Sequence, residues 1–273
     1  MPIALSQIAI SVVCATLLIC NTAAATVQTQ PVSYEDGEVA LRGSLSVDDA
    51  VEGKRPGILV IHEWWGLNDY AKRRAEQLAS MGYVAFAVDM YGEGKVADHP
   101  ADARTWSGHV TRNVTQWQKR ALAGLEVLRR RPEVDPKRIA AIGYCFGGAT
   151  VLQLAYSGAD IAGAVSFHGS LPAPDQRQAA QIKTRILICH GASDDFIAAE
   201  RIDKLRTALE SASADWQMVT YGGAVHSFTN PAADKRNMAG LGYDKRADRR
   251  SWMHMKMFFD EVFSDDGVRS VIP

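Results

Sequence analysis

The chain's most informative stretch is Gly143-Tyr144-Cys145-Phe146-Gly147-Gly148. It follows 138–142, a short apolar run typical of a buried strand, and precedes 149–156, whose Ala and Leu residues have helical spacing. A strand, a sharp turn and a helix form the context of a nucleophile elbow. The flanking glycines suit such a turn, because its backbone is strained and passes close to neighbouring segments, where a β-carbon would collide. The stretch therefore predicts that Cys145 points away from the sheet at a strand end.

The same turn places the Cys145 sulfur at the N-terminus of the predicted helix. Unpaired N–H groups and the helix dipole favour an anion there and lower the pKa of a thiol. The alternative is a core cysteine that only fills space, since free Cys is among the most buried residue types. We favour the reactive interpretation because the elbow requires glycines on both sides and a core cysteine does not.

Length and composition fit one soluble α/β domain. The chain has 273 residues, of which 47% are hydrophobic and 22% charged. Its formal net charge of -1 lacks the positive footprint of a nucleic-acid-binding protein. The arginine clusters at 129–131 and 249–250 are expected on helix ends or faces, where solvated charge is common. We therefore expect no nucleic-acid partner. We also expect the protein to be a monomer.

Residues 1–25 have the pattern of a secretory signal peptide. The run from Ile8 to Ile19 is almost wholly apolar but short for a transmembrane span, and Ala23-Ala24-Ala25 ends in an A-x-A cleavage site. We predict a signal peptide over 1–25, a single domain over 26–273, and a periplasmic or secreted protein. The alternatives are an uncleaved anchor and a lipid anchor on Cys20. After cleavage no stable membrane anchor is expected.

Cleavage would leave two thiols, Cys145 and Cys189, and remove Cys14 and Cys20. If the apolar run at 162–168 forms a strand between those that carry the two remaining thiols, they lie about 10 Å apart. That separation is beyond the reach of a disulfide. We expect both cysteines to be free.

Apolar runs alternate with helical patterns along the chain. The Asp36-Gly37 pair between two β-type runs, 32–34 and 39–47, predicts a hairpin. Further strands are expected at 56–63, 83–90, 138–142, 161–167, 185–189 and 216–221. Helices are expected at 69–78, 149–156, 198–211 and 248–263, with one extended amphipathic pattern from about 102 to 131. The alternation predicts an α/β fold whose mostly parallel sheet is covered on both faces, with an antiparallel N-terminal hairpin.

Three predicted strand ends carry reactive side chains, and ligands of open α/β sheets bind beyond the carboxyl ends of the strands. Cys145 lies at the first end, Asp194 and Asp195 at the second, and His226 at the third. The order nucleophile, acid, histidine is the chain order of α/β-hydrolases. His226 would deprotonate Cys145, and an aspartate would orient the imidazole. The spacing leaves both aspartates open for that role.

Other histidines also lie near strand ends. His62, His168 and His190 are interpreted as buried histidines with satisfied hydrogen bonds. His226 is preferred because a glycine-rich loop precedes it and because it follows both other members of the set. These histidines have no recognisable metal-ligand spacing, so we expect neither a metal nor a cofactor.

Four motifs together resemble the dienelactone hydrolase (carboxymethylenebutenolidase) family. They are His62-Glu63-Trp64-Trp65-Gly66, Gly143-Tyr144-Cys145-Phe146-Gly147-Gly148, Asp194-Asp195-Phe196 and Gly223-Ala224-Val225-His226-Ser227-Phe228. The resemblance runs from about Val32 to Phe263. It implies an α/β-hydrolase fold with a Cys-His-Asp triad in which Asp194, rather than Asp195, is the acid.

The resemblance also implies roles for residues outside the triad. Glu63 would meet the resting thiol and help to generate the thiolate when substrate displaces it, in keeping with the ability of a nearby carboxylate to take a proton. The backbone N–H groups of Trp64 and Phe146 would form the oxyanion hole. Further candidates for contact with substrate are Tyr91, Lys95 and Ser227.

The sequence departs from the family in its anion-binding arginines. Members that degrade dienelactone bind the carboxylate of the lactone with two arginines, whereas here 92–95 contains only Lys95 and His226-Ser227-Phe228 is followed by Thr229-Asn230. A lysine is a point charge without bidentate geometry. We expect a small carboxylic ester or lactone as substrate, cleaved through a thioester on Cys145. The alternatives are a lyase or peptidase using the same thiol, and a non-enzymatic binding protein on a hydrolase fold.

Overall fold

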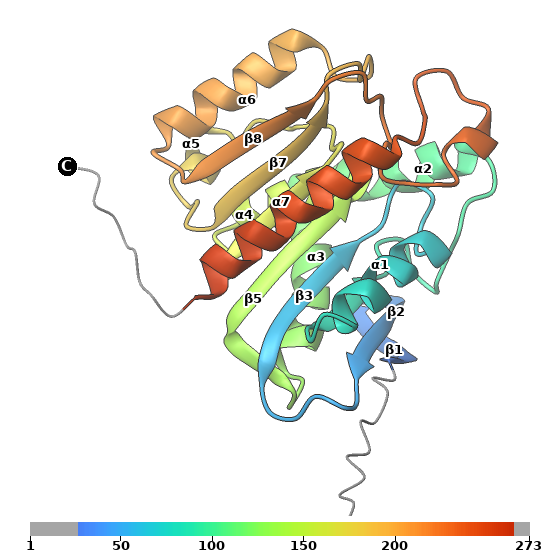
Figure 1. The fold of residues 1–273 in the computed structure, drawn as a ribbon, viewed down its shortest axis with the longest axis vertical. Coiled ribbons are helices and arrows are strands. Elements are labelled where there is room, and N and C mark those ends of the chain that lie inside the picture. Colours follow the sequence, from blue (N-terminus) through green and yellow to red (C-terminus); the bar gives the residue numbers. More distant parts are fainter. Residues whose placement is uncertain (1–26, 265–273) are drawn as a thin grey trace, which may run out of the picture.

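The computed structural model describes residues 27–264 (Figure 1). The predicted signal peptide, with Cys14 and Cys20, lies outside these residues. Within them, no helix combines the length and the apolar character needed to cross a membrane.

The described chain forms one sheet with the strand order β1-β2-β4-β3-β5-β6-β7-β8. The strands are β1 (Val27–Asp36), β2 (Val39–Asp48), β3 (Arg55–Ile61), β4 (Val84–Val88), β5 (Val134–Tyr144), β6 (Gly163–Phe167), β7 (Arg185–Gly191) and β8 (Trp216–Tyr221). β1 and β2 pair in antiparallel fashion, β2 is antiparallel to β4, and the strands from β4 to β8 are parallel. The predicted hairpin and mostly parallel sheet are confirmed.

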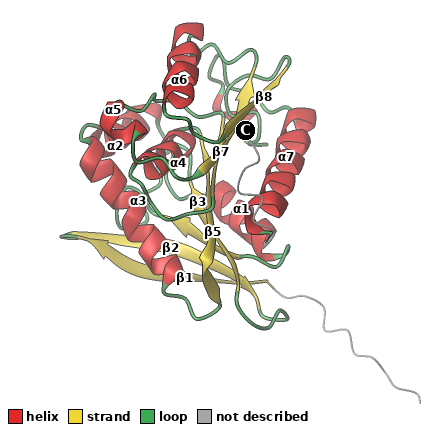
Figure 2. Cartoon of the chain, turned by 90° about the vertical axis from the view of Figure 1, so that its left-hand side faces the viewer, coloured by secondary structure: helices red, strands yellow, loops and turns green. Residues whose placement is uncertain are grey.

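Helices cover both faces of this sheet. They are α1 (Asp69–Ala79), α2 (Pro100–Thr111), α3 (Val114–Arg129), α4 (Phe146–Tyr156), α5 (Gln176–Ala179), α6 (Ala199–Ser211) and α7 (Lys245–Phe263), with a short 3-10 turn η1 (Asp234–Arg236). Figure 2 shows α1 and α7 on one side of the sheet and α2 to α6 on the other. The central strands are buried on both faces, as their continuous apolar runs predicted. The α/β-hydrolase fold is confirmed.

The long amphipathic pattern at 102–131 forms two helices rather than one. Arg112 caps the end of α2, and Asn113 begins α3 by accepting a hydrogen bond from the Gln116 N–H at 3.1 Å. An asparagine side chain replaces a missing backbone partner at a helix start, and this favours a new helix over continuation of the old one. The strand β5 also differs from expectation, because it continues through the expected turn at Pro136, next to a register shift against β3. Proline is tolerated at such an irregularity.

Candidate active site

Cys145 lies in the turn between β5 and α4, at the carboxyl end of the sheet. Its backbone has φ 55° and ψ -113°, a conformation that non-glycine residues rarely adopt. A β-carbon on Gly143 would collide with the carbonyl of Gly147, and one on Gly147 would collide with the carbonyl of Ile61. The glycines therefore permit the close approach that the sharp turn requires, and the half-buried sulfur stands at the start of a helix.

His226 and Asp194 form a hydrogen-bonded pair beyond the ends of β8 and β7. His226 Nδ1 lies 2.7 Å from Asp194 Oδ2, and both side chains are buried. Asp194 Oδ1 also accepts the Phe196 N–H at 3.1 Å, which fixes the carboxylate. Asp195, the other candidate, is exposed. Of the two aspartates, the structure therefore places Asp194 on the imidazole.

The charges around His226 favour its protonated form. Burial alone would lower the pKa of His226, but the neighbouring Cys145 thiolate and the Asp194 carboxylate outweigh burial and raise this pKa to about 10. Because Asp194 occupies Nδ1, the Nε2 side of the ring is the one available to the sulfur. The arrangement can hold a thiolate and an imidazolium side by side.

Glu63 lies in the loop after β3, but its hydrogen bonds differ from the expectation. Its two carboxylate oxygens accept the Ser227 hydroxyl at 2.7 Å and the Asn230 amide at 2.6 Å, so the carboxylate is tied to the loop after His226 rather than hydrogen-bonded to the thiol. Burial raises the pKa of Glu63, opposed by these two bonds and by the charges of His226 and Arg236. A buried carboxylate needs such donors because it has lost its water.

Ser227 was expected to contact substrate. In the structure it is buried and its hydroxyl donates to Glu63. A buried carboxylate is a stronger acceptor than a neutral group, so it takes up the nearby hydroxyl.

The two predicted oxyanion donors lie at the ends of neighbouring strands. Phe146 is the first residue of α4, where a backbone N–H has no partner within the helix. Trp64 follows β3, the strand next to β5, and its carbonyl accepts the Tyr91 hydroxyl at 2.9 Å. The Tyr91 ring packs against Phe146 with centroids 5.6 Å apart, so Tyr91 contacts both halves of the predicted hole.

A cavity of about 410 Å³ has Tyr91 in its wall. Tyr91, Lys95 and Trp106 contribute to its lining, together with side chains of α2 and α3. Lys95 is half exposed and lies 3.9 Å from Glu93, in contact with solvent. Two of the three candidate substrate contacts, Tyr91 and Lys95, therefore line one cavity, and Ser227 does not.

Sequence reasoning assigned no role to three residues near this site. Asn230 was noted only for not being arginine, and His168 was interpreted as an ordinary buried histidine. Arg236, in η1, stacks on the Trp65 ring at 3.8 Å from its centroid. No motif signals Arg236, and the only signal for His168 was its position at the end of the strand next to Cys145.

Cys145 and Cys189 are both free, as predicted. β6 lies between the strands that carry them, and burial raises the pKa of Cys189 to about 12. Across residues 27–264, no three His, Cys, Asp or Glu side chains come together in a group that could hold a metal ion.

The mostly parallel sheet and the elbow after β5 define an α/β-hydrolase. The sequence profile of the dienelactone hydrolase family matches residues 41–263, and the chain belongs to this family. Its members are hydrolases of esters and lactones, so the enzyme class expected from the sequence is confirmed.

The similarity to individual relatives extends over nearly the whole length of each relative. Protein usf of Aquifex pyrophilus is 30% identical over 240 residues, which are 86% of this chain and 99% of that protein. The solved structure m3DLH is 42% identical with a TM-score of 0.85, covering 87% of this chain and 99% of its own. A dienelactone hydrolase-like promiscuous phosphotriesterase from metagenomic libraries is 39% identical with a TM-score of 0.86, covering 88% of this chain and 100% of its own.

Proposed function

We propose that this protein hydrolyses a small, uncharged carboxylic ester or lactone through a thioester on Cys145. The observation that carries the proposal is the Asp194–His226 hydrogen bond of 2.7 Å beside a cysteine held in the elbow conformation. A nucleophile, a base and a group that orients the base are the parts that acyl transfer requires.

The proposed reaction has two halves. The Cys145 thiolate attacks the carbonyl carbon and forms a C–S bond, while the N–H groups of Phe146 and Trp64 stabilise the oxyanion. The C–O bond to the leaving alkoxide then breaks, and imidazolium His226 gives this alkoxide its proton. Neutral His226 next takes a proton from water, and the resulting hydroxide attacks the thioester. This releases the carboxylic acid and restores the Cys145 thiolate beside imidazolium His226.

The covalent intermediate gives the direct test. Mixing the enzyme with a p-nitrophenyl ester and quenching in acid within milliseconds is expected to add the mass of one acyl group, and peptide mapping is expected to place it on Cys145. A p-nitrophenyl ester acylates quickly because its leaving group is good, so the thioester accumulates. Release of p-nitrophenol with no covalent adduct at any time point would contradict the mechanism.

Substrate charge is expected to matter. Asn230, in the segment after His226-Ser227-Phe228 that lacks the family's arginine, donates to Glu63, and Lys95 lies 3.9 Å from Glu93. A substrate carboxylate without a bidentate partner loses roughly 1.5–3 kcal/mol of charge-assisted bonding. We expect kcat/KM for uncharged esters to exceed that for dienelactone by about 10-fold or more, from steady-state rates on a matched panel. Dienelactone as the best substrate of the panel would refute this.

Phosphotriesters are a second candidate class. The metagenomic phosphotriesterase is 39% identical along its full length, and triesters, like the preferred esters, carry no anionic group. We expect slow turnover of paraoxon that disappears in Cys145→Ser. A phosphorylated Cys145 is hard to hydrolyse. A single burst of p-nitrophenol with no further turnover would therefore mean that paraoxon only inhibits the enzyme.

We propose that Glu63 restrains the thiolate in the resting enzyme. Its carboxylate is bonded to Ser227 and Asn230, in the loop that carries His226, and a negative charge in this part of the site disfavours the thiolate. Glu63→Gln is expected to lower kcat about 100-fold and to speed alkylation of resting enzyme by iodoacetamide several-fold. The matched carboxyl-to-amide control is Asp195→Asn, on an exposed residue. If neither rate changes, Glu63 is a bystander.

A further inference from the structure

His168 follows β6 directly and contacts the backbone of the nucleophile turn. The Cys145 N–H points between two acceptors, the Phe167 carbonyl at 3.0 Å and His168 Nδ1 at 3.1 Å. A backbone N–H can only donate, so Nδ1 carries no proton. The proton of the neutral ring is therefore on Nε2, and the tautomer follows from the geometry.

The other side of the His168 ring faces the loop that carries the catalytic histidine. Nε2 donates to Thr229 Oγ1 at 2.7 Å, and Thr229 lies three residues after His226. The rings of His168 and His226 also meet edge to face, with centroids 5.4 Å apart. One imidazole thus touches the nucleophile turn, the base and the loop of the base.

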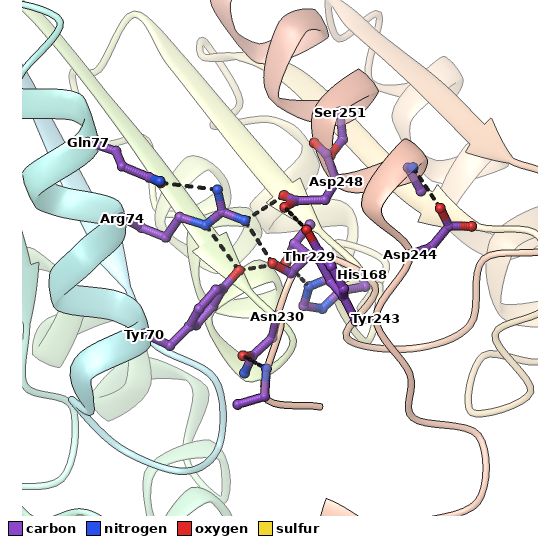
Figure 3. A network of polar contacts seen from close by, with 12 residues as sticks. Tyr70, Arg74, Gln77, His168, Thr229, Asn230, Tyr243, Asp244, Asp248 and Ser251 are labelled. Atoms are coloured by element: carbon purple, nitrogen blue, oxygen red, sulfur yellow. Dashed lines mark hydrogen bonds and ion pairs between the residues drawn. The ribbon is translucent and has the colours of Figure 1, made fainter. Parts of the chain in front are cut away.

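Thr229 is in turn bonded to α1, and Arg74 of that helix links it to α7 (Figure 3). Its hydroxyl lies 2.6 Å from the Tyr70 hydroxyl, and its carbonyl accepts Arg74 at 2.7 Å, both residues being on α1. Arg74 also pairs with Asp248 of α7. The network anchors the His226 loop to the helices on one face of the sheet. Tyr144, next to Cys145, packs on Tyr70 and Arg74, but among the described residues only His168 joins this network to Cys145 through hydrogen bonds.

The surroundings of His168 keep its ring neutral. The side chain is completely buried, and burial lowers its pKa well below the usual value, with the charges of His226 and Arg74 acting in the same direction. A protonated ring would place an N–H against the Cys145 N–H. His62, also buried, accepts the Met90 N–H through Nε2 and has no such contact with Cys145.

We propose that His168 is a positioning residue that holds the Cys145 turn in register with the His226 loop. The inference rests on the proposed role of Cys145 as nucleophile. The positive φ of Cys145 is intrinsically disfavoured for a residue with a β-carbon, so hydrogen bonds from neighbouring segments must hold its backbone. His168 Nδ1 supplies one, and Nε2 couples that partner to the loop of the base.

Three substitutions separate positioning from filling of space. His168→Asn places an oxygen where Nδ1 is and suits the left-handed φ of 39° at this residue. His168→Gln puts its amide near Nε2 and removes the acceptor for Cys145, and His168→Phe fills the space without polar atoms. Tyr156→Phe is the control, since the Tyr156 hydroxyl donates to the Pro172 carbonyl at the far end of α4 from Cys145.

We expect His168→Gln and His168→Phe to lower kcat about 10- to 100-fold, with KM within two-fold of wild type. For His168→Asn we expect kcat to stay within about five-fold of wild type. The control is expected to keep wild-type kcat. A space-filling role predicts the opposite order, because Asn leaves the largest cavity and loses the most stability. If kcat falls in the order of the melting temperatures, with Asn worst, the proposal is wrong.

Alkylation of Cys145 by iodoacetamide gives a readout that does not depend on the substrate. His168→Gln and His168→Phe are expected to slow this alkylation several-fold, because the sulfur moves away from His226. His168→Asn is expected to leave the alkylation rate near that of wild type. Failure of the proposed function would appear separately, as ester turnover that survives Cys145→Ala. If the His168 variants do not fold, Thr229→Val, which keeps the side-chain volume, is expected to lower kcat about 3- to 10-fold, and an unchanged kcat would overturn the proposal.

Discussion

Cys145→Ala is expected to lower kcat for p-nitrophenyl esters by about 10⁶-fold, the scale seen when a triad nucleophile is deleted. The variant keeps the oxyanion donors and the Asp194–His226 pair, so a residual rate above that in water is expected to remain. No covalent intermediate can form, and the burst of p-nitrophenol in stopped-flow traces is expected to vanish with it.

Cys189→Ala is the matched control for this variant. Cys189 is the other free cysteine of the described residues. Its buried sulfur accepts a hydrogen bond from the Tyr221 hydroxyl at 3.5 Å. This substitution is expected to leave kcat within two-fold while lowering the melting temperature slightly, because it opens a small cavity. A Cys145→Ala enzyme with more than about a hundredth of wild-type kcat would rule out cysteine catalysis.

Asp194→Asn is expected to lower kcat at neutral pH by about 10⁴-fold. The amide can offer its N–H to Nδ1, which turns the imidazole to the wrong tautomer, and it removes the charge that stabilises the imidazolium. Asp195→Asn, one residue further along in an exposed position, is expected to have no effect. Equal losses in both variants would point to a loop effect rather than to the His226 pair.

The pH profile gives a second check on the same pair. With Asp194 and Cys145 beside it, the pKa of His226 is raised to about 10, so the imidazolium that protonates the leaving group is present at neutral pH and is lost as the pH rises through about 10. We expect kcat/KM of the wild type to decline as the pH rises through about 10. In Asp194→Asn the decline is expected to begin at lower pH, because the raising charge is gone.

Short-range signals were sufficient for much of the fold. Asp36-Gly37 and the glycines around Cys145 act within a few residues of themselves, through turn geometry and close backbone approach. Strand runs such as 56–61 are apolar because both faces of the sheet are covered. The break at Asn113 also had a local signal, a capping residue, which the continuous amphipathic pattern obscured.

The polar contacts of the site were less accessible. Glu63 is bonded to Ser227 and Asn230, more than 160 positions away, and nothing in its neighbourhood along the chain announces that choice. His168 reaches Cys145 because β6 happens to adjoin β5 in the sheet order. Motif resemblance supplied the residues proposed to take part in the reaction, but it could not supply the hydrogen-bond partners that hold them.

The amino-acid order thus determines the strands, the elbow, the family and the set of reactive groups, since each depends on neighbours in the chain or on a motif. Folding in three dimensions selects the partners of each buried polar group. A buried carboxylate or imidazole that has lost its water must find donors and acceptors among whatever groups the packed strands and helices bring within about 3 Å. For Glu63 and His168 those groups come from loops that only the sheet order brings together.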